Sequence, residues 1–179
     1  IKMKPRTQSG HELRDAIAAI VGPKYVIDDY YALIPYARDI SAFPGVMPGI
    51  VVRPESSEEL SEIVKLANRT GYPVTVKGGG QGGGSVTKGE ATRNIMIDMG
   101  RMDAIKVDAD NQKVTAGAGA RLSTVDDALR PYGRYINTVI GPYFTATVGG
   151  LTSGIAGAGF GKNVASTGCN WTSVLGLKV

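Results

Sequence analysis

The sequence has few of the residues on which disulfides and metal sites depend. It contains one cysteine, Cys169, and one histidine, His11, in 179 residues. One cysteine excludes a disulfide within the chain, and one cysteine with one histidine cannot supply the ligand cluster of a structural zinc site. We therefore expect no structural metal. We expect Cys169 to be a small buried residue and His11, in an amphipathic helix, to lie on the surface.

Long apolar runs and blocks of like charge are also missing. No run approaches the roughly 20 apolar residues of a membrane-spanning helix, and the first residues, Ile-Lys-Met-Lys-Pro-Arg, lack the apolar centre of a signal peptide. The net charge of +4 comes from scattered lysines and arginines, without the charge block typical of a nucleic-acid-binding tail. These features predict a cytoplasmic protein with no membrane span and no nucleic-acid partner. The mild positive charge suits an anionic cofactor or substrate.

Glycine, in contrast, is concentrated in one loop. Residues 78–84 are all glycine except Gln81, and they follow a β-type segment that ends at Lys77. Without Cβ atoms, successive backbone N–H groups can turn toward one anion and approach a pyrophosphate closely. The alternative is a flexible linker. Because a buried-looking strand at residues 73–76 precedes the loop and another at 95–99 follows it, we favour a nucleotide-binding loop within a domain.

Capping residues and apolar periodicity predict three helices. They run from Ser9 to Gly22, from Ser56 to Gly71, and from about Ser123 to residues 131–133. In the second helix, the face expected to be buried consists of Leu60, Ile63, Val64 and Ala67. In the third helix, Asp126 is expected to act as an anion in the first turn.

Strands are predicted in the intervals between these helices. They comprise residues 49–52, 74–76 and 95–99, and a hairpin that pairs residues 105–107 with 114–116. Helices and strands do not alternate strictly, so the pattern favours an α+β fold over a doubly wound sheet. Residues 174–179 also have the pattern of a strand. We therefore expect that more chain follows or that another chain completes the sheet.

Two common phosphate-binding motifs do not account for the glycine loop. Residues 78–83 satisfy G-x-G-x-x-G, but a Rossmann loop opens directly into a helix, and residues 85–94 have no apolar helical face. No Gly-Lys-Ser or Gly-Lys-Thr closes the run, which excludes the P-loop. A second region rich in small residues spans 141–161. It is explained either by close helix packing or by a second wall of an extended ligand site, and we favour the second wall.

Several segments, in order, resemble motifs of the vanillyl-alcohol oxidase and p-cresol methylhydroxylase superfamily of flavin-dependent oxidases and dehydrogenases. This superfamily includes the flavin subunits of glycolate oxidase and D-lactate dehydrogenase. The segments are Tyr-Ala-Arg-Asp at 36–39, Val-Val-Arg-Pro at 51–54, Lys-Gly-Gly-Gly-Gln at 77–81, Ile-Asp-Met-Gly-Arg-Met at 97–102, Val-Thr-Ala-Gly-Ala-Gly at 114–119, Ala-Thr-Val-Gly-Gly at 146–150, and residues 168–179. Each motif alone is permissive, but their order and spacing agree with the family.

The resemblance implies an α+β, two-lobed FAD-binding domain with the cofactor between the lobes. Lobe 1 would span about residues 1–103 and lobe 2 about 104–179, incomplete at the C-terminus and without the substrate or cap domain. The residues expected to line the pyrophosphate are Gly78, Gly79, Gly80, Gln81, Gly82, Gly84 and Ser85. Those expected to face the rest of FAD are Gly149, Gly150, Ser153, Gly154 and Gly157. Lys77 replaces the family's arginine, which keeps the charge at the phosphates but loses the bidentate fork.

The resemblance also bears on chemistry. Members that bond the flavin covalently use a histidine where this chain has Gln81, and some add a cysteine where it has Thr147, so we expect non-covalent FAD. FAD would accept a hydride from a small alcohol, with a 2-hydroxy acid expected. No catalytic base is identified, and Tyr135 and Tyr143 are more typical of core or rim positions. The alternatives are an NADPH-dependent reductase of a nucleotide sugar and a non-catalytic nucleotide-binding or assembly subunit.

Overall fold

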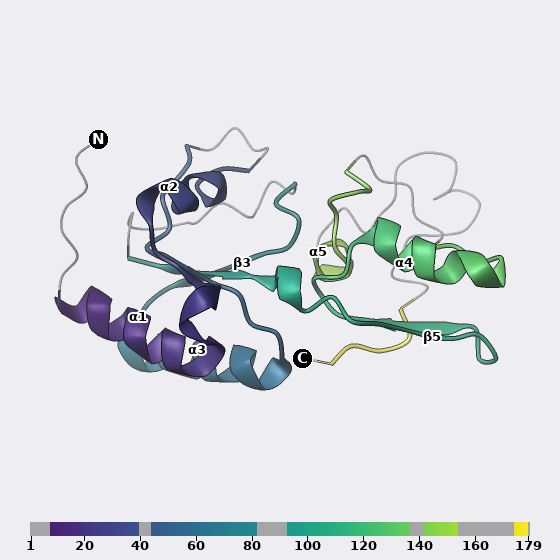
Figure 1. Ribbon diagram of the computed structural model, residues 1–179, viewed down its shortest axis with the longest axis horizontal. Coiled ribbons are helices and arrows are strands. Elements are labelled where there is room, and N and C mark those ends of the chain that lie inside the picture. Colours follow the sequence, from purple (N-terminus) through teal and green to yellow (C-terminus); the bar gives the residue numbers. More distant parts are fainter. Residues whose placement is uncertain (1–7, 40–43, 82–92, 137–141, 154–173, 179) are drawn as a thin grey trace.

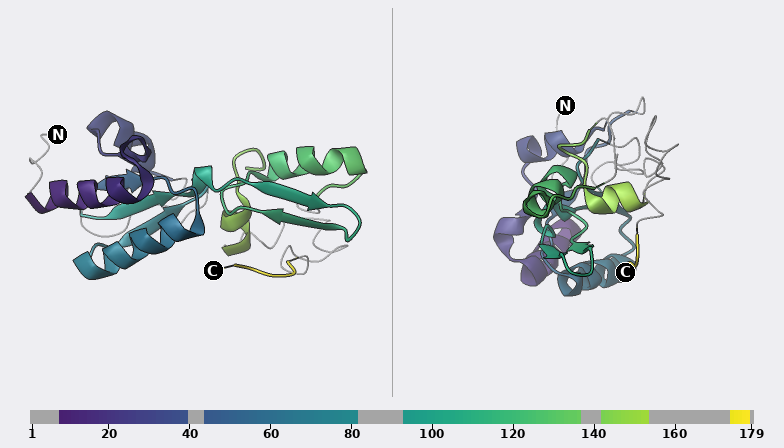
Figure 2. Two further views of the ribbon diagram at one scale, coloured as in Figure 1. Left: turned by 60° about the horizontal axis from the view of Figure 1, so that its bottom comes forward. Right: turned by 90° about the vertical axis from the view of Figure 1, so that its right-hand side faces the viewer.

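The computed structural model describes residues 8–39, 44–81, 93–136, 142–153 and 174–178. Figure 1 shows two groups of elements that lie side by side along the long axis of the molecule. One group contains a four-stranded sheet with its helices, and the other contains a two-stranded sheet with two helices. A view turned by 60° shows the same separation (Figure 2). No helix within the described ranges is both long and apolar enough to cross a bilayer.

The larger sheet has the strand order β1-β2-β4-β3. Its strands are β1 (Val26–Ile27), β2 (Ile50–Val52), β3 (Val74–Lys77) and β4 (Ile95–Asp98). β2, β3 and β4 are parallel, and β1 is antiparallel to β2. The central strands β2 and β4 are continuous apolar runs because both faces of the sheet are covered there. The predicted strands 49–52, 74–76 and 95–99 are confirmed.

We had expected the strand that leads into the glycine loop to be buried, and this expectation is wrong. β3 forms an edge of the sheet, and its Val74 and Val76 are 37% and 55% exposed. The residues of β3 alone do not show whether the strand is buried or exposed, because its exposure depends on its position at the edge of the sheet.

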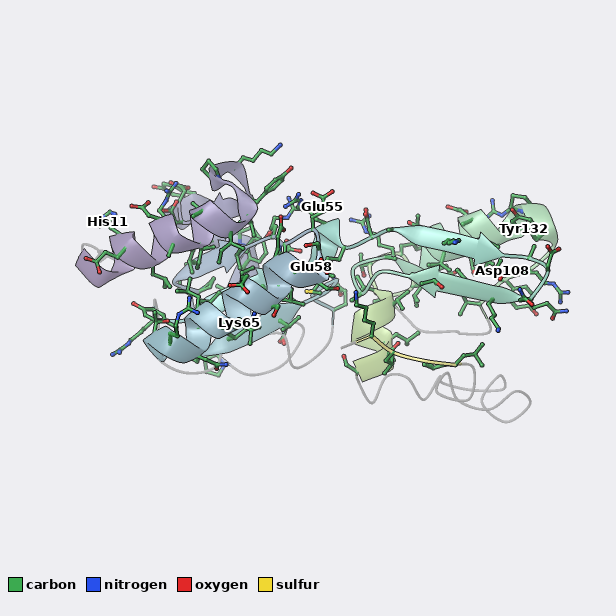
Figure 3. The ribbon with its side chains drawn as sticks, turned by 90° about the horizontal axis from the view of Figure 1, so that it is seen from below. His11, Glu55, Glu58, Lys65, Asp108 and Tyr132 are labelled. Carbon is green, nitrogen blue, oxygen red and sulfur yellow. The ribbon has the colours of Figure 1, made fainter. Side chains whose placement is uncertain are left out.

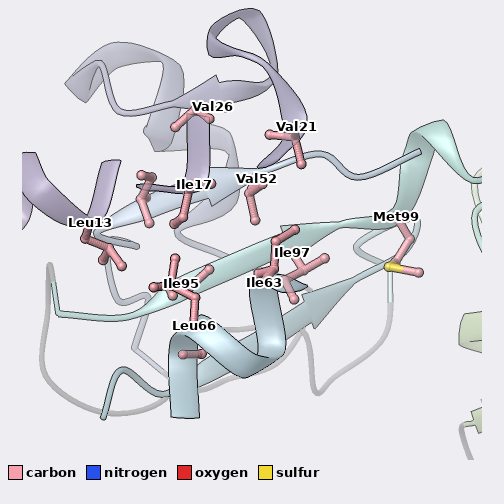
Figure 4. Close-up of a cluster of buried hydrophobic side chains, with 12 residues drawn as sticks. Leu13, Ile17, Val21, Val26, Val52, Ile63, Leu66, Ile95, Ile97 and Met99 are labelled. Atoms are coloured by element: carbon pink, nitrogen blue, oxygen red, sulfur yellow. The ribbon is translucent and has the colours of Figure 1, made fainter. Parts of the chain in front are cut away.

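Helices cover both faces of the larger sheet. On one face, α1 (Gln8–Val21) and α3 (Ser57–Thr70) bury the cluster of Figure 4, which includes Ile17 and Ile63 against Val52, Ile95 and Ile97. On the other face, α2 (Tyr30–Leu33) packs Leu33 against Val51 and Met96. Alternate residues of β2 and β4 therefore supply two separate cores, as the period of two in a strand requires.

The first two predicted helices are confirmed to within one residue at each end. The Ser56 hydroxyl caps α3 by accepting from the Glu59 amide at 3.1 Å, and Gly71 ends it at φ +68°. One expected core residue is wrong: Val64 is exposed, and Leu66 is buried instead. Ile63 and Ala67 are buried as predicted.

The smaller sheet is a hairpin of β5 (Ile105–Asp108) and β6 (Lys113–Ala116). Its register pairs Ile105 with Ala116 and Val107 with Val114, which confirms the predicted hairpin. α4 (Leu122–Leu129) packs against it through Val125 and Leu129. α5 (Val148–Ser153) lies beside this group.

Two further expectations are wrong. α4 begins at Leu122, with Arg121 at its N-cap, and Asp126 is not in its first turn. The Asp126 carboxylate instead accepts from the Ile136 amide at 2.6 Å and from the Tyr143 hydroxyl, and so connects α4 to the chain beyond it.

Residues 174–178 are exposed and form no strand, because no described strand supplies a hydrogen-bonding ladder for them.

Candidate functional site

Charged residues gather at the carboxyl edge of the larger sheet. Arg53 directly follows β2, Lys77 ends β3, and Asp98 ends β4. Because these strands are parallel, their carboxyl ends meet at one edge, which is where open α/β sheets commonly bind ligands. The register places Lys77 opposite Asp98. A carboxylate therefore lies between two cations.

Asp98 organises this edge. Its Oδ2 accepts a hydrogen bond from the Tyr36 hydroxyl at 2.7 Å, and its Oδ1 accepts from the Gly100 amide at 2.8 Å. Oδ2 also lies 3.4 Å from Nε of Arg53. The carboxylate is only 15% exposed, so these contacts are weakly screened by water. The Tyr-x-Arg-Asp segment thus contributes its tyrosine as a support for Asp98.

Tyr36 is held in its neutral form. Burial raises its pKa to about 12, and the hydrogen bond to Asp98 and the charge of Asp98 act in the same direction. Arg53 opposes the shift. The phenol therefore donates to Asp98 throughout the physiological pH range.

This shift predicts a specific loss of stability at high pH. The folded-state pKa of Tyr36 lies above the unfolded value of 10.0, so its contribution is fully present below pH 10 and is lost as the pH rises toward 12. The stability advantage of wild type over Tyr36→Phe, measured as the difference in urea midpoint, is expected to shrink between pH 10 and pH 12. An advantage that stays constant over this interval would show that Tyr36 titrates normally.

Lys77 points toward Tyr36. Its Nζ lies 4.3 Å from the centre of the Tyr36 ring and donates to the Pro35 carbonyl oxygen at 3.2 Å. Burial lowers the pKa of Lys77, and the charge of Asp98 partly offsets this. The ammonium therefore already has neighbours within the protein, namely a ring, a carbonyl and a nearby carboxylate.

The glycine loop packs directly against the second small-residue region. A Cβ atom built on Gly78 would collide with Oγ1 of Thr147, and one on Gly79 would collide with the carbonyl oxygen of Thr145. Thr147 itself is buried, and its Oγ1 accepts from the Gly150 amide at 3.3 Å. The described parts of the two regions, residues 78–79 and 145–147, therefore lie side by side.

Residues 117–120 form a strip of backbone between the segment that follows the larger sheet and the start of α5. On one side, the amides of Gly117 and Gly119 donate to the carbonyls of Ala104 and Met102 at 2.8 and 2.9 Å. On the other side, the carbonyls of Ala118 and Ala120 accept from the amides of Gly149 and Val148 at 2.8 and 2.9 Å. A Cβ on Gly119 would collide with the Met99 carbonyl. Residues 117–120 are thus hydrogen-bonded along both edges.

A cavity of about 420 Å³ opens between these segments. Its lining combines glycines, hydroxyls and charged side chains: Arg53, Gly78, Gly79, Asp98, Gly100, Asp103, Gly119, Ala120, Arg121, Thr124, Thr145 and Thr147. The volume lies within the range of small-molecule sites. The lining comes from the carboxyl ends of β2 and β4, the residues that follow β3 and β4, the first turn of α4, and the segments that precede α4 and α5.

The residues predicted from the sequence occupy different places around this cavity. Gly78 and Gly79 line it. Gly80, at φ +72°, packs on the Lys77 side chain, and Gln81 is exposed. Gly149, Gly150 and Ser153 belong to α5, where a Cβ on Gly149 would meet Ala118. The remaining predicted residues lie outside the described part of the chain: Gly82, Gly84, Ser85, Gly154 and Gly157.

Other residues at the cavity were missed by the sequence analysis. Its charged residues are two arginines and two aspartates, Arg53, Arg121, Asp98 and Asp103, and its threonines are Thr124, Thr145 and Thr147. Arg53 and Asp98 stand at the carboxyl ends of two predicted strands, and that position was the available signal. It became informative only with the knowledge that these strands are parallel neighbours.

The tyrosines considered as catalytic residues lie away from the cavity lining. Tyr143 donates to Asp126, and Tyr135 is exposed. His11 is exposed as predicted, and Figure 3 shows it on the outer part of α1, at the opposite end of the molecule from Tyr132. Cys169 lies outside the described residues.

The donor set fits the anionic part of a nucleotide. The glycine positions let the backbone approach a ligand closely, and arginines contribute positive charge from both groups of elements. The hydroxyls of Thr124 and Thr147 can donate to phosphate or ribose oxygens, whereas the Thr145 hydroxyl already donates to the Pro142 carbonyl. Fold and cavity together are typical of an α+β nucleotide-binding domain, with a cavity at the carboxyl ends of the parallel strands.

Comparison with known proteins identifies the family. Residues 48–178, more than half of the chain, match the family described as FAD binding domain. The chain therefore belongs to this family, and FAD is its cofactor. Solved structures have the same fold: alkyldihydroxyacetonephosphate synthase superposes with a TM-score of 0.79 at 23% identity over 94% of this chain, and p-cresol methylhydroxylase with 0.71 at 19% identity over 84%. This confirms the expected p-cresol methylhydroxylase type of FAD-binding fold.

Curated relatives include a D-lactate dehydrogenase and FAD-linked oxidoreductases. A D-lactate dehydrogenase of Archaeoglobus fulgidus is 41% identical over 110 residues, which cover 60% of this chain and 24% of the relative. An uncharacterized FAD-linked oxidoreductase of Mycobacterium tuberculosis is 31% identical over 137 residues, which cover 75% of this chain and 28% of the relative. The chain spans about a quarter of the length of these relatives. It also covers 33% of the synthase and 31% of the methylhydroxylase.

Proposed function

We propose that this chain is the flavin-binding part of an enzyme that oxidises a small 2-hydroxy acid by hydride transfer to FAD. The observation that carries the proposal is the cavity where Gly78 and Gly79 meet Thr145 and Thr147, since it joins the two glycine regions around one anion-binding space. The substrate class is supported by the likeness to D-lactate dehydrogenase. We further propose that lobe 1 (about 1–103) and lobe 2 (about 104–179) hold FAD between them.

The described residues have distinct tasks in this proposal. Bound FAD supplies the hydride acceptor. Gly78 and Gly79 let the loop pack closely against residues 145–147, and Thr145 and Thr147 line the cavity beside it. Asp98 fixes the carboxyl edge of the sheet through Tyr36 and the Gly100 amide. Residues that contact the substrate are expected in a further domain or in a partner chain. A cytoplasmic location stays a prediction from the sequence.

The test is anaerobic mixing of the full-length protein with candidate reductants, followed at the flavin absorbance near roughly 450 nm. D-lactate, L-lactate and glycolate are compared with NADPH. Rapid bleaching by a 2-hydroxy acid, with NADPH inactive, is the expected result. Rapid bleaching by NADPH alone would favour the reductase alternative. A flavin that none of them reduces would favour a non-catalytic subunit.

The same sample tests the mode of attachment. We propose non-covalent FAD, because Gln81 and Thr147 stand where some relatives carry a linking histidine and cysteine, and neither an amide nor a hydroxyl provides a comparable nucleophile. Acid precipitation is expected to leave the yellow colour in the supernatant. Colour retained in the washed pellet would contradict non-covalent attachment.

A further inference from the structure

We propose that Arg53, positioned by Asp98, is the side chain that binds the diphosphate of FAD, in the role that the family resemblance gives to Lys77. This inference rests on the proposed placement of FAD in the cavity. It adds a binding residue that lies outside the glycine loop. It also gives different roles to Arg53 and Lys77, the two cations at the carboxyl ends of the parallel strands.

Arg53 lies at the cavity, and its guanidinium has N–H groups that are still available to a ligand. It lines the cavity, and its side chain is 38% exposed. Among the described residues its Nε is buried without a hydrogen-bond partner, and the 3.4 Å contact with Asp98 is an ion pair only. The guanidinium lies beside Gly100, where a Cβ would stand 3.6 Å from Nη2, an ordinary contact distance. A planar guanidinium with free N–H groups suits the bidentate recognition of phosphate.

Lys77 is directed elsewhere. Its ammonium lies over the Tyr36 ring and donates to the Pro35 carbonyl, and the residue does not line the cavity. Burial lowers its pKa, so the charged form already carries a desolvation cost. Reaching a phosphate would require Lys77 to leave both contacts, whereas Arg53 already faces the cavity.

Both the backbone and the side chain of Arg53 are held in place. Nη1 of Arg101 donates to the Arg53 carbonyl at 2.7 Å, and the Arg101 guanidinium lies 3.2 Å from the centre of the Tyr25 ring. Arg101 also pairs with Glu55. Asp98 then orients the Arg53 side chain through the ion pair at Nε. A cation fixed before the ligand arrives loses little conformational freedom on binding.

The opposing interpretation is that Arg53 only neutralises Asp98. The two roles differ in what Arg53→Lys does. A lysine keeps the charge beside Asp98 but loses the phosphate fork, so a neutralising role tolerates it and a phosphate-binding role does not. They also differ in salt dependence, because a direct contact between an arginine and a diphosphate is weakened by ionic strength.

The experiment titrates the flavin-free protein with FAD at low and at high NaCl concentration, with flavin fluorescence as the signal. The variants are Arg53→Met, Arg53→Lys and Lys77→Met. Arg93→Met is the matched control. Arg93 lies just before the amino end of β4, whereas Asp98 lies at the carboxyl end of that strand, and the Arg93 guanidinium is near the Tyr72 ring. Melting temperatures of the flavin-free proteins are recorded alongside.

We expect Arg53→Met to raise the Kd for FAD about 10- to 100-fold at low salt, with a smaller effect at high salt. Arg53→Lys should fall between wild type and Arg53→Met, and Lys77→Met and Arg93→Met should stay within about threefold of wild type. Wild-type affinity in Arg53→Met would overturn the proposal, and so would a larger loss in Lys77→Met. If Arg53→Met does not fold, Arg53→Lys decides: wild-type affinity in that variant would overturn the proposal. A wild-type protein that binds no FAD would instead refute the proposed function.

Discussion

Gly79→Ala is expected to destabilise the protein by about 2–3 kcal/mol and to weaken FAD binding at least tenfold. The added Cβ would collide with the Thr145 carbonyl oxygen, which is backbone and cannot rotate away. Overpacking of this kind forces the chain to move at a typical cost of about 1–3 kcal/mol. Here the movement separates the two walls of the cavity, so ligand binding is affected together with stability.

The measurement is thermal unfolding by circular dichroism together with FAD titration. The melting temperature should fall by about 4–12 °C for a chain of this size. Gly176→Ala is the matched control, because a Cβ there meets nothing within 4 Å, and it should match wild type. If Gly79→Ala behaves like Gly176→Ala, the contact between the glycine loop and residues 145–147 is absent in solution.

Asp98→Asn is expected to cost about 2–3 kcal/mol of folding free energy. The substitution leaves Arg53 and Lys77 side by side without the carboxylate between them, and it weakens the acceptor of the Tyr36 hydroxyl. Removing one partner of a largely buried ion pair costs more than the pair contributes, because the remaining charge stays poorly solvated. The expected cost is below that of a fully buried pair, since Arg53 is partly exposed.

Urea unfolding measures this loss, and titration of tyrosine absorbance provides a second readout. Without the Asp98 charge, the pKa of Tyr36 should move down from about 12 toward its ordinary value. Asp110→Asn, in the exposed turn of the hairpin, is the control and should change neither quantity. An unchanged urea midpoint in Asp98→Asn would show that the carboxylate does not organise this edge.

Elements with local signals were predictable from the sequence. α3 carries a serine cap, an acidic first turn and a terminal glycine, and the hairpin has paired apolar segments around a polar turn. β1 and α2 were missed because they are only two and four residues long and their identity depends on the sheet they contact. The exposure of β3 and the absence of a strand at residues 174–178 depend on neighbours in space, which local sequence patterns do not reveal.

In the candidate site, too, the sequence predicted the local features but not the contacts between distant segments. The glycine loop and residues 145–150 were identified because both are dense in small residues, but their contact is long-range. The sequence suggested that the glycines serve close approach to a phosphate. The structure adds that Gly78 and Gly79 are also needed for the approach of another segment of the chain. Arg53 and Asp98 become neighbours through the parallel register of β2 and β4, which the sequence could not specify.

The strip at residues 117–120 has a mechanical consequence. Because its amides donate to the carbonyls of Met102 and Ala104 on one side and its carbonyls accept from the amides of Val148 and Gly149 on the other, separating these segments means breaking main-chain hydrogen bonds. The three segments are therefore expected to move as one unit, so the part of the cavity wall formed by Gly119 and Ala120 should keep its place when a ligand binds.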